Sequence, residues 1–97
     1  MKTRTAFARS LKEVRKTKGF TQEDFSVVSS RTYISMLERE VTSPTLDKIE
    51  IIAEAMKVHP LTLLTLTYLK AGAYRNVEDL FKKVRSDLAA IDALRRE

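Results

Sequence analysis

The sequence predicts an all-α protein, with five helices followed by an additional amphipathic helix at the C-terminus. Apolar residues recur three and four positions apart over most of the 97 residues, which is the spacing of one helix face. Residues that cap or stop helices separate these runs, and no segment gives a secure strand. A chain of this length can form one small core, to which partner contacts or a dimer would add.

The first two helices are marked by their ends. The first is expected at residues 5–18 and stops at Gly19, since glycine readily adopts the left-handed conformation that often follows a helix. The second begins after Thr21, a favourable N-cap, and Asp24 resembles the acid of a capping box. Their expected core residues are Phe7, Leu11, Val14, the stem of Lys18, Phe25 and Val28, with Phe20 as a hydrophobic staple.

The third and fourth helices each follow a hydroxyl side chain. Ser30 is the better N-cap for the third helix, which turns Ile34 and Leu37 inward and ends in the loop 40–44. Thr45 caps the fourth helix in the same way. The expected apolar face of the fourth helix comprises Leu46, Ile49, Ile52, Ala53 and Met56.

The C-terminal third contains two apolar segments. The Thr-rich alternation of residues 61–69 could form a strand, but its length and Pro60 favour a buried helix, because proline suits a first helical turn. Residues 71–73 end it, and a last helix is expected at residues 76–95. Its apolar stripe either folds back on its own domain or packs against a second subunit. The stripe comprises Val77, Leu80, Phe81, Val84, Leu88, Ile91 and Leu94.

Positive charge is concentrated at the N-terminus. The net charge is +5, and residues 1–20 carry seven Lys and Arg side chains against one acid. This distribution is typical of a nucleic-acid-binding surface, although a solvated helix face preceded by a loose arm has the same composition. Lys2, Arg4 and Arg9 could contact phosphates or a minor groove as a flexible arm, or remain free solvated charges.

Several classes of protein are excluded or disfavoured by residues that the chain lacks. It has no Cys and a single histidine, His59, so disulfides and thiolate metal sites are excluded, and we expect no metal and no cofactor. No nucleophile–base–orienter set is visible, so we expect no enzymatic activity. No stretch is apolar enough to span a membrane and no signal-peptide pattern is visible, which indicates a cytoplasmic protein.

A set of short motifs covers the first two thirds of the chain. Their residues are Leu11, Val14, Arg15, 19–25, Tyr33, Ile34, Ser35, Leu37, Glu38, Arg39, Pro44, Thr45, Leu46, Ile52, Ala53, Val58 and Leu64. In order and spacing, residues 7–64 resemble the phage-repressor and Cro-like helix-turn-helix family, also called the XRE family. The resemblance implies a five-helix lambda-repressor-like DNA-binding domain at residues 1–64 and a helical extension at residues 65–97.

The resemblance also implies roles for particular residues. The third helix, around residues 30–39, would enter the major groove of DNA, and Arg15 and Glu38 would form an ion pair that braces it against the first helix. Arg31 suits a guanine edge, although it could instead neutralise a phosphate. The residues implied for base contacts are Arg31, Thr32, Ser35 and Met36. Those implied for phosphate contacts are Thr21, Gln22, Tyr33, Arg39, Thr42 and Ser43.

Three departures from the family pattern lie near the third helix. The turn formed by residues 27–32 is two residues short, which leaves the start of that helix open. Glu40 stands where a glycine commonly follows, so the helix must end without the residue best suited to the left-handed conformation. The loop 40–43 has no basic side chain, so phosphate contact there would rely on hydroxyls and backbone amides.

The sequence therefore predicts a sequence-specific transcriptional regulator that binds double-stranded DNA, most often a repressor in this family. We expect a homodimer, because two recognition helices read two half-sites. The residues expected to form it are Leu66, Leu69, Val77, Leu80, Phe81, Val84, Leu88 and Ile91. The alternative is an antitoxin-like or other protein-interaction module, whose C-terminal helix binds a partner protein. A toxin and RNA polymerase are the candidate protein partners.

Overall fold

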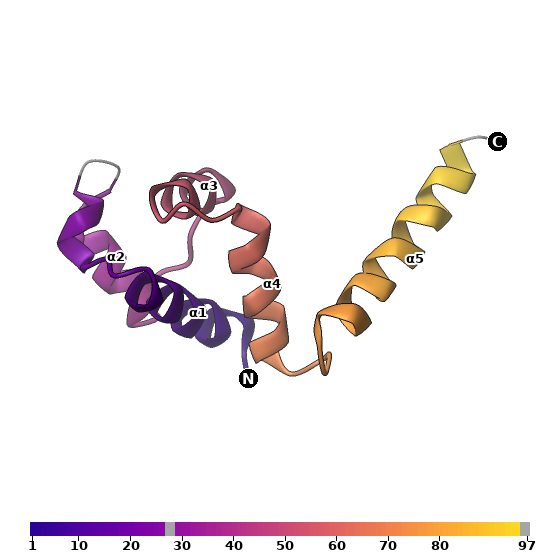
Figure 1. Cartoon of the computed structure of the whole chain (residues 1–97), viewed down its shortest axis with the longest axis horizontal. Helices are drawn as coiled ribbons and strands as arrows, with labels where there is room; N and C mark the ends of the chain where they lie inside the picture. The colour runs from indigo at the N-terminus through magenta and orange to yellow at the C-terminus, as the bar shows by residue number, and fades with distance from the viewer. Residues whose placement is uncertain (27–28, 96–97) are drawn as a thin grey trace.

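The computed structural model describes residues 1–26 and 29–95, and these residues form helices and no strand. The predicted all-α fold is confirmed for this part of the chain, and the Thr-rich segment 61–69 is helical. Figure 1 shows the first elements gathered into one body, from which the last helix stands away. The elements are α1 (Thr3–Thr17), η1 (Gln22–Phe25), α2 (Arg31–Glu38), α3 (Leu46–Ala55), α4 (Pro60–Ala71) and α5 (Val77–Arg95).

α1 begins two residues earlier than predicted, because Lys2 already adopts the extended conformation of an N-cap and its carbonyl accepts the first helical hydrogen bond. The helix stops where predicted, before Gly19, whose φ is +80°. The Gly19 N–H donates to the carbonyl of Lys16, and the Phe20 N–H donates to that of Arg15. These two bonds form a Schellman motif, which satisfies the last carbonyls of the helix.

α2 and α3 end in the same motif without a glycine. The left-handed position is occupied by Glu40, with φ +64°, and by Lys57, with φ +61°. In both cases the N–H groups of this residue and the next one donate back to helix carbonyls. For a residue that has a side chain, the left-handed conformation is less favourable by about 1 kcal/mol. Glu40 is also tied to α1, because the Thr5 hydroxyl donates to its carboxylate.

The second predicted helix is a single 3-10 turn, η1. Thr21 and Asp24 form the predicted capping box, in which each side chain accepts a hydrogen bond from the backbone N–H of the other residue. The rings of Phe20 and Phe25 pack with centroids 6.0 Å apart, as expected of a hydrophobic staple. α2 begins directly after the predicted Ser30 cap.

α4 packs mainly against α1 and buries one face rather than its whole surface. Leu63 and Thr67 are buried, whereas Leu61 and Tyr68 are about half exposed. The expectation of a buried helix is therefore wrong for the outer face, because the core of this small domain reaches only one side of the helix. α4 also runs unbroken through residues 64–65, so the division expected there falls inside a helix.

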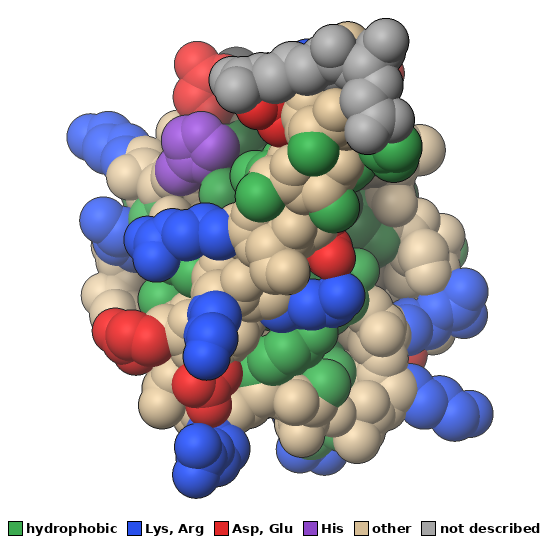
Figure 2. Space-filling view, turned by 90° about the vertical axis from the view of Figure 1, so that its right-hand side faces the viewer, with side chains coloured by type: hydrophobic (Ala, Val, Ile, Leu, Met, Phe, Trp, Pro, Cys, Tyr) green, Lys and Arg blue, Asp and Glu red, His purple; other side chains and the backbone are tan. Residues whose placement is uncertain are grey.

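α5 leaves its apolar stripe largely uncovered. Gly72, with φ +94°, ends α4, and the Asn76 side chain caps α5 by accepting a hydrogen bond from the Asp79 N–H. Only Leu80 of the stripe is buried and Phe81 is half-buried, so beyond its first turns the stripe is not folded back on its own domain. The exposed members are Val77, Val84, Leu88, Ile91 and Leu94. Figure 2 views the molecule from the right-hand side of Figure 1, where patches of hydrophobic side chains lie among charged ones.

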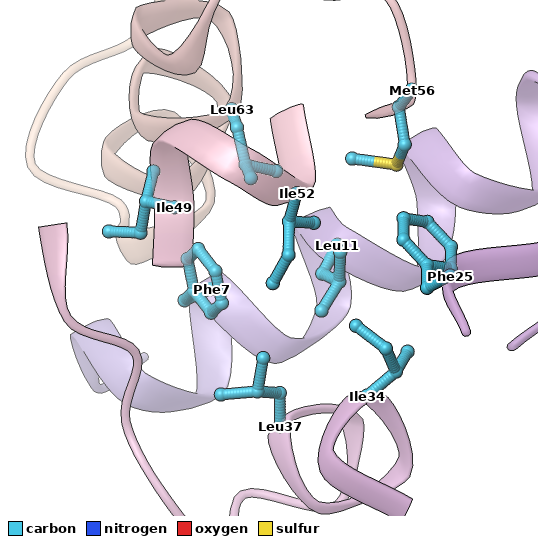
Figure 3. Packing of buried hydrophobic residues seen from close by; sticks show 9 residues of the cluster. All are labelled: Phe7, Leu11, Phe25, Ile34, Leu37, Ile49, Ile52, Met56 and Leu63. Atoms are coloured by element: carbon cyan, nitrogen blue, oxygen red, sulfur yellow. The ribbon is translucent and has the colours of Figure 1, made fainter. Parts of the chain in front are cut away.

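A cluster of buried apolar side chains holds the other elements together. Its members point toward one another from α1, η1, α2, α3 and α4 (Figure 3). They are Phe7, Leu11, Phe25, Ile34, Leu37, Ile49, Ile52, Met56 and Leu63. Leu46 and Lys18 were expected in the core and are exposed, because Leu46 lies at the edge of the buried arc of α3 and Lys18 follows the last residue of α1. Val28, also expected there, lies outside the described residues.

Within residues 1–26 and 29–95, no helix is long and apolar enough to cross a membrane. The same residues contain no group of three or more His, Asp or Glu side chains placed to hold a metal ion.

Candidate nucleic-acid interface

α2 presents a polar face because its other face is held in the core. Ile34 and Leu37 are buried, whereas Arg31, Thr32 and Arg39 are exposed on the other side of the helix. A shallow hollow on this outward face is lined by Gln22, Arg31, Thr32, Ser35 and Arg39. Arg31, Thr32 and Ser35, which were predicted for base contacts, therefore lie on one surface. Gln22 and Arg39, which were predicted for phosphate contacts, lie on the same surface. Met36, the fourth residue predicted for base contacts, is half-buried and does not line the hollow.

Arg31 is paired with an acid that the sequence did not single out. Its Nη1 donates to Oε1 of Glu23 at 3.3 Å, which connects the start of α2 to η1 across the turn. Both side chains remain exposed, at 66% and 72%. The sequence shows only that Glu23 follows Gln22 in the capped motif. Pairing with Arg31 depends on how the shortened turn folds, which residue spacing does not reveal.

A buried ion pair braces the inner side of α2. The Arg15 guanidinium donates to the two carboxylate oxygens of Glu38 at 2.7 and 2.9 Å, and to the carbonyl of Phe20 at 2.9 Å. The Arg15 and Glu38 side chains are only 9% and 5% exposed. The hydrogen bond to Glu38 raises the pKa of Arg15, and burial partly opposes this effect. The predicted ion pair is therefore present, and it links α1, the segment before η1, and α2.

Gln22 is oriented by the same carboxylate. Its Nε2 donates to Oε1 of Glu38 at 3.3 Å. The side chain lies beside Arg31, because both residues line two adjoining hollows at the N-terminal end of α2. Thr21 lines the second of these hollows and is exposed, although its hydroxyl oxygen already accepts the capping hydrogen bond. Both residues thus lie next to the start of the exposed helix.

Tyr33 lies on the flank of α2 and packs partly against the core. Burial raises the pKa of its phenol. The Nζ of Lys48, from the first turn of α3, lies 5.3 Å from the centre of the Tyr33 ring, which is a cation–π distance. The structure therefore places a cation that the sequence did not single out beside a residue predicted for phosphate contact.

The C-terminal end of α2 continues into a polar loop. Arg39 is exposed, and its Nε donates to the hydroxyl of Ser35 at 3.2 Å. Ser43 is exposed and accepts a hydrogen bond from Nε of Arg4 at 2.8 Å, whereas Thr42 is half-buried. Arg4 lies in the first turn of α1, so the expectation of a flexible arm is wrong for this residue. The fold thus brings a cation beside a loop that carries none of its own.

The geometry of η1 and α2 defines a class of protein. Two short capped elements follow each other in the chain and pack together, the core holds both, and the second presents a polar face. This is the arrangement of a helix-turn-helix DNA-binding module.

A family model described as helix-turn-helix matches residues 11–63, which is more than half of the chain. The chain therefore belongs to the phage-repressor and Cro-like (XRE) family of helix-turn-helix proteins, whose domain is a DNA-binding regulatory one and not a catalytic one. Comparisons with curated proteins and with solved structures found no match. The family match ends within α4 and leaves α5 outside it.

Proposed function

We propose that this DNA-binding regulator is a transcriptional repressor that binds a specific duplex sequence as a homodimer, with α2 in the major groove. The observation that carries the proposal is the outward polar face of α2, which is opposite the buried Ile34 and Leu37. A helix held in this way enters the groove in one orientation, so its side chains meet base edges in a defined register.

The proposed base-contact residues differ in what they can recognise. Arg31 suits the O6 and N7 acceptors of guanine, while Thr32 and Ser35 can hydrogen-bond to several bases. Met36 would make an apolar contact, for which the methyl group of thymine is suited. A good bidentate contact discriminates against the wrong base by about 1–3 kcal/mol. Arg31 is therefore expected to contribute most to the selection of sequence.

Groups suited to phosphate contact lie at both ends of α2. The helix has eight residues, so it is about 12 Å long, which is comparable to the width of the major groove. Contacts at both ends would hold the helix from two sides without reading sequence. The proposed phosphate-contact residues are Thr21, Gln22, Tyr33, Arg39, Thr42 and Ser43, with Arg4 and Lys48 as additional cations.

α4 and α5 offer a surface for the dimer. Two apolar hollows lie between these helices, and the exposed stripe continues beyond them along α5. A two-fold dimer reads two half-sites about 34 Å apart, whereas one recognition helix contacts few base pairs. A bound dimer also covers a longer stretch of duplex, which would exclude polymerase from a promoter. The proposed dimer residues are Leu66, Leu69, Val77, Leu80, Phe81, Val84, Leu88 and Ile91.

The test of sequence-specific binding is selection of bound duplexes from a random pool, carried out with the unchanged protein and with Arg31→Ala. We expect a defined preferred sequence, and we expect Arg31→Ala to lose the preference at one base position. Arg85→Ala removes the same charge from α5, outside the helix-turn-helix, and should leave every preference in place. Uniform weakening by Arg31→Ala would assign Arg31 to a phosphate, and no preference in the unchanged protein would contradict the proposal.

A further inference from the structure

We infer that Glu23 is a positioning residue for base recognition: it holds Arg31 toward a guanine edge and keeps it from binding a phosphate. The inference rests on the proposed function, because it takes the outward face of α2 as the DNA-contacting surface. The observation that carries it is the ion pair between Arg31 Nη1 and Glu23 Oε1, at 3.3 Å, on that surface.

Both partners come from elements that are held in place on their own. Glu23 lies in η1, which the capping box of Thr21 and Asp24 closes. Arg31 is the first residue of α2, which Ser30 caps. The ion pair therefore connects two separately capped elements, and it favours side-chain conformations of Arg31 that keep the guanidinium beside Glu23.

The pair is not needed to hold the fold together. Its two side chains are 66% and 72% exposed, and an exposed ion pair contributes little to folding stability. Its interaction becomes stronger when bound DNA displaces water, because the local dielectric constant falls. Only Nη1 of Arg31 donates to Glu23, so Nε and Nη2 remain available. A guanidinium has five N–H donors, which is enough for Glu23 and for the two acceptors of guanine.

Charge distinguishes Arg31 from the other arginines at this interface. Arg4 and Arg39 donate to the hydroxyls of Ser43 and Ser35, and neither has an acidic partner among the described residues. These two keep a full positive charge for phosphates. The positive charge of Arg31 is balanced by Glu23, and a phosphate brought to Arg31 would also approach the carboxylate.

The Glu23 carboxylate does not repel a base edge in this way, because a base edge offers polar acceptors without a full negative charge. The pair therefore weakens contacts that any duplex can make and leaves the guanine contact intact. Selectivity of this kind comes from a repulsive element directed against the wrong partner.

The test is Glu23→Gln, which keeps the shape of the side chain and removes its charge. Glu54→Gln is the matched control, since Glu54 is exposed on α3 and has no ion pair among the described residues. Binding is measured on the selected duplex and on random duplex over a series of salt concentrations. We expect Glu23→Gln to bind random DNA several-fold more tightly and to steepen the logarithmic salt dependence by about one unit.

The ratio of specific to random affinity should fall about tenfold in Glu23→Gln and stay unchanged in Glu54→Gln. In sequence selection, the lost preference should lie at the base position that Arg31→Ala also affects. A merely structural role of Glu23 would instead weaken both duplexes equally, and that result would overturn the inference. A new preference at another position would also overturn it, because it would indicate that residue 23 contacts a base directly.

Failure of the proposed function gives a different result. If the unchanged protein shows no sequence preference, the proposed function itself fails. If the unchanged protein is selective and Glu23→Gln keeps both its selectivity and its salt dependence, only the role of Glu23 is contradicted.

Discussion

One carboxylate organises the inner side of the proposed DNA-binding surface. Glu38 accepts hydrogen bonds from Arg15, which comes from α1, and from Gln22, which comes from η1. A buried ion pair depends on both members, because either charge left alone would be desolvated without a partner. The stability of the domain and the orientation of a proposed phosphate contact therefore depend on the same residue.

Replacing Glu38 with Gln is expected to lower the free energy of unfolding by about 3–5 kcal/mol, because Arg15 would remain as a buried cation without its counter-charge. The double variant Arg15→Met/Glu38→Leu should lose clearly less than the sum of the two single changes, since it leaves no charge unpaired. Urea unfolding followed by circular dichroism measures Glu38→Gln, the single changes Arg15→Met and Glu38→Leu, and the double variant. Additive losses would show that the two side chains do not act as a pair.

At the scale of helices, the ends are specified more strongly than the interiors. Thr21, Ser30 and Thr45 each cap the element that follows, through a hydrogen bond to a backbone N–H three residues later. Helix ends also depend on residues close in sequence. In two of the three Schellman motifs, however, the left-handed position holds a residue with a side chain, whose backbone is strained there, whereas glycine would adopt this conformation without strain. Glu40 recovers part of this free energy through the hydrogen bond from Thr5, whereas the Lys57 side chain has no hydrogen-bond partner among the described residues.

Lys57→Gly is expected to stabilise the protein by about 1 kcal/mol, because it removes the left-handed strain at the end of α3. In a domain of this size that corresponds to a rise in Tm of about 4–8 °C. Glu40→Gly should gain less, since it also removes the hydrogen bond from Thr5. Lys57→Ala is the control and should give no gain. If alanine stabilised as much as glycine, backbone strain would not be the cause.

The whole molecule is elongated, with principal extents of 49 × 26 × 23 Å, because α5 extends away from the body formed by α1 to α4 (Figure 1). An isolated helix is marginally stable in water, and most helices in proteins depend on the packing of an apolar face. The exposed stripe of α5 therefore requires a partner surface. In the proposed homodimer a second copy of the chain would supply one, since each copy carries both the stripe and the apolar hollows between α4 and α5.

Leu88→Glu is expected to convert a dimer into an 11.1 kDa monomer, because it places a charge in the middle of the exposed stripe. Ser86→Glu puts the same charge on the opposite face of α5 and should leave the dimer intact. Light scattering at micromolar concentration measures the mass. The monomeric variant should also bind the selected duplex more weakly, since its half-sites are occupied independently.

An 11.1 kDa mass for the unchanged protein would contradict the homodimer. If the unchanged protein instead purifies together with a small partner protein and Leu88→Glu does not, the antitoxin-like alternative is favoured, in which α5 binds a different protein.

Several features of this protein follow from its sequence alone. Helix caps and stops depend on residues three to five positions apart, so Thr21, Ser30 and Gly19 could be read directly. The alternation of buried and exposed residues in α2 follows from helical spacing. The ion pair between Arg15 and Glu38 was predicted from the family resemblance, because its two residues lie in different helices and no local spacing connects them.

Only the tertiary structure decided the features that join distant segments. The contacts of Arg31 with Glu23, of Arg4 with Ser43 and of Glu40 with the start of α1 depend on how α1, η1 and the loop after α2 pack. Periodicity likewise predicts that a helix face is apolar but not what covers it. It therefore did not predict that Leu46 and most of the α5 stripe are exposed. The local hydrogen bonds of caps are encoded within a few residues, whereas these contacts exist only once the core has brought separate elements together.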